Sequence, residues 1–218
     1  MALSAVEIGQ RLNTAFDRLL DQYAEWGGHR FHGWTDYDDP SNYFGGVIWS
    51  EADCVLRFCL ELEKEFPQQV HCEFSIDKAT RHDWERRLVP VPEGKRPGRQ
   101  AIDIVVSDLS GFQADANAQH TFRHRQHEAF IEVKWLKKGW SDGPWRHEAP
   151  RRVREVDEDL RQLAWHLQLG RCWTAAMLVF DDEDSLHEYS PPIVWPSDVL
   201  RFVVGPAVLK ERGLLLGG

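Results

Sequence analysis

Apolar positions recur along the chain with the periods of helices and strands, and their order predicts a layered α/β fold. Residues 4–25 and 152–169 each carry apolar side chains at spacings of three and four, which predicts amphipathic helices. Residues 51–66 repeat this spacing. Ser50, with Asp53 three residues later, forms a capping-box pattern before that helix, and a proline follows it.

Other segments have the composition of β-strands. The segment 70–76 alternates between apolar and polar residues, whereas later segments are nearly continuous apolar and β-branched runs, as in strands buried on both faces. These later segments are 101–109, 129–136 and 174–182, with a strand-like FVVG near the end of the chain. Polar segments rich in turn residues separate them at 27–49, 78–99, 110–127 and 137–151. This order predicts one domain over residues 1–218, with a central sheet flanked by helices.

Two of the expected strands hold charged residues where apolar residues are expected. Asp103 interrupts Ala-Ile-Asp-Ile-Val-Val, and Glu132 and Lys134 interrupt Phe-Ile-Glu-Val-Lys-Trp. Residues two apart on a strand share a face, so Glu132 and Lys134 point to the same side. Because a buried carboxylate is costly unless it is paired or binds a metal, we expect these three residues to meet at one site.

This combination of residue types suits the hydrolysis of phosphodiester bonds. Two carboxylates, Asp103 and Glu132, can hold Mg²⁺ or Mn²⁺, which polarises a phosphate oxygen and acidifies a bound water. Lys134 can orient that water or help to deprotonate it, and can offset the charge that builds on phosphorus. The backbone carbonyl of Val133, between the two side chains, is a further candidate ligand.

The same residues resemble the PD-(D/E)xK nuclease superfamily. Asp103 matches its first acid, and Glu132, Val133 and Lys134 match the (D/E)xK element, although the proline that precedes the acid in the family signature is missing. The resemblance covers roughly residues 50–182. It implies a restriction-endonuclease-like core, with a mixed sheet flanked by helices, a magnesium-type cofactor and a nucleic-acid substrate.

The resemblance also implies roles for Glu51 and Gln162. Many members carry a glutamate at the start of an upstream helix as a third metal contact. Glu51 fits that place, Glu73 in the following strand is its rival, and a first-turn glutamate is also favoured by the helix dipole without any function. Members often carry a Gln or Lys on the helix after the (D/E)xK strand. Gln162 fits, and a helix-surface amide is the alternative interpretation.

Charge bears on the expected partner. A net charge of −9 argues weakly against nucleic acid. Two basic stretches change this picture, because residues 78–99 and 134–154 each hold seven Lys and Arg, against three and two acids. Trp140 and Trp145 in the second stretch could stack on bases, although core packing is the plainer interpretation. DNA is therefore the expected partner.

The remaining polar features predict less specific roles. The four cysteines lack CxxC spacing and are interpreted as small buried apolar residues. His120, His124 and His127 lie in a loop-like segment and are interpreted as a solvated or phosphate-facing turn. No apolar run is long enough to cross a membrane, and the start of the chain lacks the order of a signal peptide, so a cytoplasmic protein is expected.

The sequence thus predicts a Mg²⁺- or Mn²⁺-dependent nuclease, and two alternatives stay open. The first is a catalytically silent nucleic-acid-binding or assembly module of a defence or repair complex. The second is a hydrolase of small phosphodiesters, which would have an enclosed pocket instead of an open basic groove. Enzymes of this type often cut two strands as dimers, so a homodimer or a larger complex also fits, although no dimer surface is readable in the sequence.

Overall fold

The computed structural model describes residues 3–25, 50–76, 100–107, 127–136, 148–181, 186 and 192–214. These residues contain one mixed sheet with the strand order β1-β2-β3-β4-β5. Its members are β1 (Val70–Ile76), β2 (Gln100–Val106), β3 (His127–Leu136), β4 (Cys172–Asp181) and β5 (Val199–Val204). The first three strands pair in antiparallel fashion, and β4 and β5 continue the sheet in parallel with β3.

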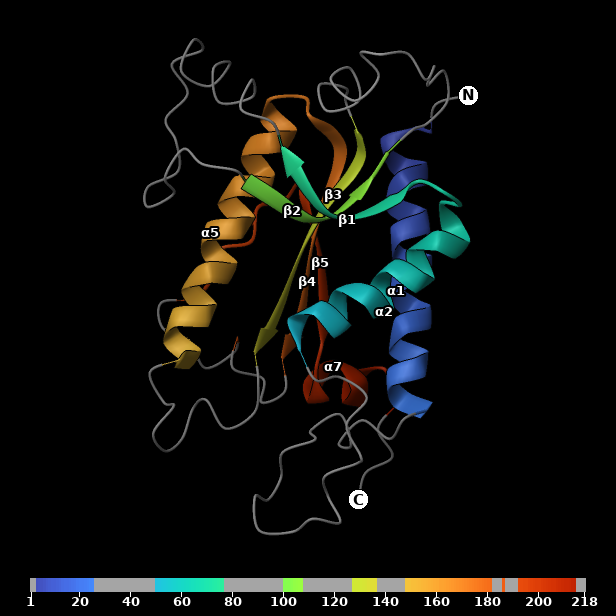
Figure 1. Ribbon diagram of the computed structural model, residues 1–218. Coiled ribbons are helices and arrows are strands. Elements are labelled where there is room, and N and C mark those ends of the chain that lie inside the picture. The colour runs from blue at the N-terminus through green and yellow to red at the C-terminus, as the bar shows by residue number, and fades with distance from the viewer. Residues whose placement is uncertain are drawn as a thin grey trace.

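Helices cover both faces of this sheet, so the fold is α/β as predicted (Figure 1). One face packs against α1 (Ala5–Glu25) and α2 (Glu51–Glu65), and the other packs against α5 (Glu148–Gln168). A short helix, α7 (Pro206–Glu211), follows β5 and was not predicted. Because both faces of β3 and β4 are covered, these strands are buried along almost their whole length.

The helix ends follow the local signals in the sequence, with one exception. Ser50 is the N-cap of α2, and the Asp53 N–H donates to its Oγ at 3.2 Å, which confirms the predicted capping pattern. The exception is α5, which begins at Glu148, four residues before the predicted start. Pro150 is tolerated there because the amides of a first helical turn have no acceptor within the helix.

The interpretation of His127 as part of a solvated turn is wrong, and His120 and His124 lie outside the described residues. His127 is the first residue of β3 and is buried, with its Nδ1 2.8 Å from the Ser107 Oγ. Burial and the nearby charge of Arg171 lower the pKa of His127 to about 4. The ring is therefore a neutral part of the protein interior.

The cysteines are only partly as predicted. Cys54, Cys59 and Cys172 are buried, but Cys72 is exposed. Cys72 lies on β1, which forms one edge of the described sheet and leaves this side chain accessible. Its Sγ lies 3.1 Å from the Sγ of Cys59 on α2.

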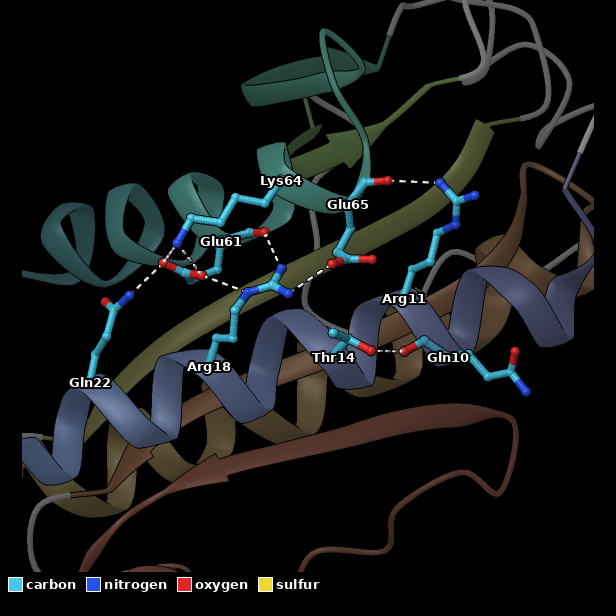
Figure 2. Close-up of polar contacts among 8 residues, drawn as sticks. All are labelled: Gln10, Arg11, Thr14, Arg18, Gln22, Glu61, Lys64 and Glu65. Atoms are coloured by element: carbon cyan, nitrogen blue, oxygen red, sulfur yellow. Dashed lines mark hydrogen bonds and ion pairs between the residues drawn. The ribbon is translucent and has the colours of Figure 1, made fainter.

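A network of charged side chains joins α1 to α2 around a buried carboxylate (Figure 2). Glu61 on α2 is 2% exposed, and it pairs with Arg18 at 2.9 Å and with Lys64 at 2.7 Å. Gln22 also donates to it. Burial alone would raise the pKa of Glu61, but the hydrogen bonds from Lys64, Arg18 and Gln22 outweigh burial and lower it. Glu61 is thus a fully paired structural charge.

Most of the two basic stretches lies outside the described residues, including residues 77–99 and 137–147 with Trp140 and Trp145. The structure therefore leaves the predicted basic surface as a prediction. In the part of the chain that the structure describes, no helix combines the length and the apolar character needed to cross a bilayer.

Candidate active site

The strand register brings Asp103 and Glu132 to the same level of the sheet. Ile104 of β2 pairs with Ile131 of antiparallel β3, so Asp103 and Glu132 lie opposite each other on neighbouring strands. Val105, which shares a face with Asp103, packs in the core beneath α5. Both acids therefore point toward α5, where Glu132 is 4% exposed and Asp103 is half-buried.

Carboxylates replace backbone acceptors along the next part of β3. Beyond Ile131, the Val133 N–H donates to the Asp103 Oδ2 at 2.8 Å, and the Trp135 N–H donates to the Glu51 Oε2 at 3.3 Å. These amides lie on the edge of β3 that β2 covers earlier along the strand. The two carboxylates are thus fixed side by side on one strand edge, although they come from a strand and a helix far apart in the sequence.

Glu51 reaches this edge because α2 begins there. It is the first residue of α2, directly after the Ser50 N-cap. Figure 1 shows the start of α2 beside the end of β3, with α5 across the sheet. The Glu51 carboxylate lies 3.7 Å from the Lys134 Nζ and 3.8 Å from a nitrogen of Arg152, which belongs to α5. The first residue of α2 therefore contacts both β3 and α5 through its side chain.

The Lys134 ammonium is buried among acids. Its Nζ lies 3.0 Å from the Asp159 Oδ2 on α5 and donates to the Val133 carbonyl at 3.3 Å. Burial alone would lower the pKa of Lys134, but the carboxylates of Asp159, Glu51, Glu132 and Asp103 outweigh burial and raise it. Lys134 is consequently a fixed cation at neutral pH, which suits orienting water and offsetting charge better than accepting a proton.

Glu132 is in the opposite situation. Burial, the charges of Asp103 and Asp159, and a hydrogen bond with Asp103 raise the pKa of Glu132 well above its usual range, and only Lys134 opposes them. The charged form of Glu132 is therefore disfavoured in this place. Ionising all of these acids together is costly in a protein interior unless a further positive charge, a proton or a metal cation, is supplied.

The donor set is suited to a hard divalent cation. No group of three or more His, Cys, Asp and Glu side chains with metal-binding geometry occurs in the described ranges. Mg²⁺, however, is commonly held by one or two carboxylates and completes its shell with water and phosphate oxygens. Asp103 and Glu132 form such a pair, and the Val133 carbonyl lies next to them, because its own N–H bonds to Asp103. These residues fit the cation.

The third metal contact, assigned to Glu51 or to its rival Glu73, stays a prediction. Glu51 bonds to the Trp135 N–H and to Lys134, and its metal role stays a prediction. Its rival Glu73 lies on β1 at the level of Asp103, as the flanking β1–β2 pairs show, but its side chain lies outside the described residues.

Gln162 is not a surface amide. It lies on α5, is 1% exposed, and its Oε1 has no hydrogen-bond partner among the described residues. Asp159 precedes it by three residues and so lies on the same helix face. A buried amide oxygen without a donor is costly, and a water or a ligand that donates to Gln162 would offset this cost.

Sequence reasoning missed Asp159 and Arg152. The signal for Asp159 was present, because it follows Val156 by three residues and precedes Leu163 by four, which places it on the apolar stripe of the helix. An acid on that stripe must have a buried partner, and the partner is Lys134. Arg152 had no comparable signal, because it stands at the start of the predicted helix within a run of arginines.

No family model, curated protein or solved structure matches this chain. The resemblance of Asp103, Glu132 and Lys134 to the PD-(D/E)xK pattern therefore stays a prediction. The residue pattern and the geometry of the site carry the functional argument.

Proposed function

We propose that this protein is a Mg²⁺- or Mn²⁺-dependent nuclease that hydrolyses phosphodiester bonds in DNA. One observation carries the proposal: Asp103 and Glu132 lie level on adjacent strands, and Lys134 follows on the same face of β3. Burial and the neighbouring acids oppose the charged form of Glu132, which supports a cation that would stabilise it, and the nearby lysine supports a negatively charged reacting group.

Each residue has a role that follows from its position. Asp103, Glu132 and the Val133 carbonyl would hold the cation, which supplies Lewis acidity and lowers the pKa of a bound water. Lys134, which stays protonated, would bind a phosphate oxygen or the attacking water and offset developing charge. Glu51 is proposed to assist at the same strand edge.

The charge balance also supports a strict dependence on metal. Four acidic side chains act on the charge of Lys134, those of Asp159, Glu51, Glu132 and Asp103. A phosphodiester is an anion and would be repelled by this set unless a divalent cation were bound. The basic stretches 78–99 and 134–154 favour a polyanionic substrate such as DNA over a small phosphodiester.

The fold is compatible with the restriction-endonuclease-like core that the residue pattern implies. That core is expected to be a mixed sheet flanked by helices, and the described residues form such a sheet with α2 before it and α5 between β3 and β4. We therefore propose that this sheet is a restriction-endonuclease-like core.

The direct test is cleavage of plasmid and oligonucleotide DNA with Mg²⁺, with Mn²⁺ and with EDTA. Lys134→Ala is expected to lower the cleavage rate by about 100-fold or more, as loss of a charge-stabilising donor commonly does. Lys210→Ala is the matched control, because Lys210 is exposed on α7. Cleavage that persists in EDTA, or a Lys134→Ala variant as active as the wild type, would refute the proposal.

A second candidate function is a catalytically silent nucleic-acid-binding or assembly module. It is favoured by the carboxylates of Asp103 and Glu51, which are already bonded to the backbone amides of Val133 and Trp135. Calorimetry separates the two candidates. A nuclease should show heat of Mn²⁺ binding that Glu132→Gln removes, whereas a silent module should bind DNA without any Glu132-dependent Mn²⁺ heat.

A further inference from the structure

The buried ion pair with Asp159 is the shortest described contact of the Lys134 ammonium. The Lys134 Nζ lies 3.0 Å from the Asp159 Oδ2 but 3.7 Å from the nearest Glu51 oxygen. Both side chains are nearly inaccessible, with 12% of Lys134 and 7% of Asp159 exposed. Asp159 is also the carboxylate that contributes most to raising the pKa of Lys134.

The surroundings of Asp159 fix its place. It lies on the face of α5 that packs on the sheet, between the fully buried side chains of Val156, Leu160 and Leu163. A helix held by such packing gives its aspartate little freedom, because the side chain has only two rotatable bonds. A buried ion pair adds little to stability compared with an apolar pair of similar volume. The pair therefore calls for an explanation other than stability.

Lysine, in contrast, can reach several acceptors from the same position. Its flexible four-carbon stem lets the ammonium move between neighbours. Without Asp159, the available carboxylates would be those of Glu132, Asp103 and Glu51, all of which raise the pKa of Lys134. An ammonium bound to Glu132 or Asp103 would neutralise the charge that attracts the cation. The Val133 carbonyl, which the ammonium contacts in the structure, keeps a second lone pair for the cation.

We propose that Asp159 is the positioning residue for Lys134. It holds the ammonium beside the Val133 carbonyl and keeps it off Asp103 and Glu132, so that the two carboxylates stay free for a divalent cation. This inference rests on the proposed function, because it assigns a partner to the lysine of the proposed metal-dependent site.

Asp159→Asn tests the inference, with Asp157→Asn as the matched control on the same helix. Asp157 pairs with Arg161 at 2.6 Å on the solvent-facing side of α5. Asp159→Asn is expected to weaken Mn²⁺ binding and to lower the single-turnover cleavage rate by about 10- to 100-fold each, the usual effect of losing an outer-shell partner. Asp157→Asn is expected to change neither by more than about twofold.

Deleting any acid near a cation weakens cation binding, so the decisive measurement is made without Lys134. If Asp159 acts through the lysine, Asp159→Asn has no further effect on Mn²⁺ affinity or cleavage rate in a Lys134→Ala background. If the two effects multiply, Asp159 acts on the metal or water itself and the inference is overturned. The double variant removes both members of the buried pair, so neither charge of that pair is left without its partner.

The two proposals can fail separately. A wild-type protein that binds Mn²⁺ in a Glu132-dependent manner but cleaves no DNA would refute the nuclease. The Mn²⁺ affinities of the wild type and the three variants of this cycle would still decide the role of Asp159. A wild-type protein that cleaves DNA with Mg²⁺, combined with an Asp159→Asn variant equal to it in rate and affinity, would refute the inference alone.

Discussion

Glu132→Gln is expected to stabilise the metal-free protein at pH 8, whereas Glu61→Gln is expected to destabilise it. Both glutamates are buried, at 4% and 2% exposure, and both substitutions replace a carboxylate by an amide of the same shape. Their surroundings shift the two pKa values in opposite directions. Other acids raise the pKa of Glu132, and cationic and amide donors lower the pKa of Glu61 (Figure 2).

The magnitudes follow from what each substitution removes. At Glu132 it removes a carboxyl whose ionisation is opposed by burial, Asp103 and Asp159, and a stabilising substitution commonly adds about 0.5–2 kcal/mol to the free energy of unfolding. At Glu61 it weakens charged hydrogen bonds from Arg18 and Lys64, which are partly exposed, so a loss of about 1–3 kcal/mol is expected. For a domain of this size, 1 kcal/mol corresponds to roughly 2–4 °C in Tm.

The assay is urea and thermal unfolding in EDTA across a pH series. When folding raises the pKa of a carboxyl, the folded protein loses stability as pH rises above the ordinary pKa of that group, which is 4.5 for a glutamate. The stability gained by Glu132→Gln should therefore be small near pH 4.5 and grow toward pH 8. Glu61 has the opposite dependence, because its pKa is lowered on folding. The penalty of Glu61→Gln should be complete at pH 7 and shrink as pH falls below 4.5.

The reasoning would be refuted if Glu132→Gln destabilised the protein at pH 8, or if its effect did not change with pH. Either result would mean that Lys134 compensates Glu132 fully and that no charge excess calls for a cation. Equal signs for Glu132 and Glu61 would likewise contradict the assigned electrostatics. Loss of stability in both variants would point to packing alone.

Three further predictions concern metal, pH and oxidation. Mg²⁺ at ten to a hundred times its dissociation constant should stabilise the wild type by about 1–3 kcal/mol, and an equal Tm shift in Asp103→Asn would contradict the proposed ligand. The pKa values of His127 and His166 are lowered by burial to about 4 and about 3, so the free energy of unfolding should fall as pH drops below about 6.5; a flat profile in urea titrations between pH 7 and 5 would contradict this. A thiol oxidant such as diamide should form a disulfide between Cys59 and Cys72, whose Sγ atoms are 3.1 Å apart. Intact-mass spectrometry should then record the loss of two hydrogens, and the same mass loss in a Cys72→Ser variant would contradict the pairing.

The parts of the fold that depend on local signals could be predicted from the sequence. The helix starting after Ser50 and the strands around Asp103 and Glu132 follow from capping, periodicity and apolar runs, each of which acts within a few residues. The side of the strand to which Glu132 and Lys134 point follows from the two-residue repeat. The expectation that Asp103 lies near Glu132 also holds, because a lone buried carboxylate requires a neighbour.

The partners that come from other elements could not be predicted. The Val133 amide bonds to Asp103, and the Trp135 amide bonds to Glu51. Both contacts depend on where the pairing of β2 with β3 ends, and no residue pattern in the sequence gives that position. The start of β3 at His127 was missed because its partner, Ser107, belongs to another strand end. Tertiary contacts decide these positions, and propensity does not.

The acids around Lys134 connect stability with function. In the metal-free protein, Glu132 raises the free energy of the folded state because Asp103 and Asp159 lie close to it. A change to glutamine would remove this cost, as stabilising substitutions at functional positions commonly do. Under the proposed function, a cation bound beside Asp103 and Glu132 offsets the same cost. The sign of the Glu132→Gln effect is therefore a test of the proposed function as well as of the electrostatics.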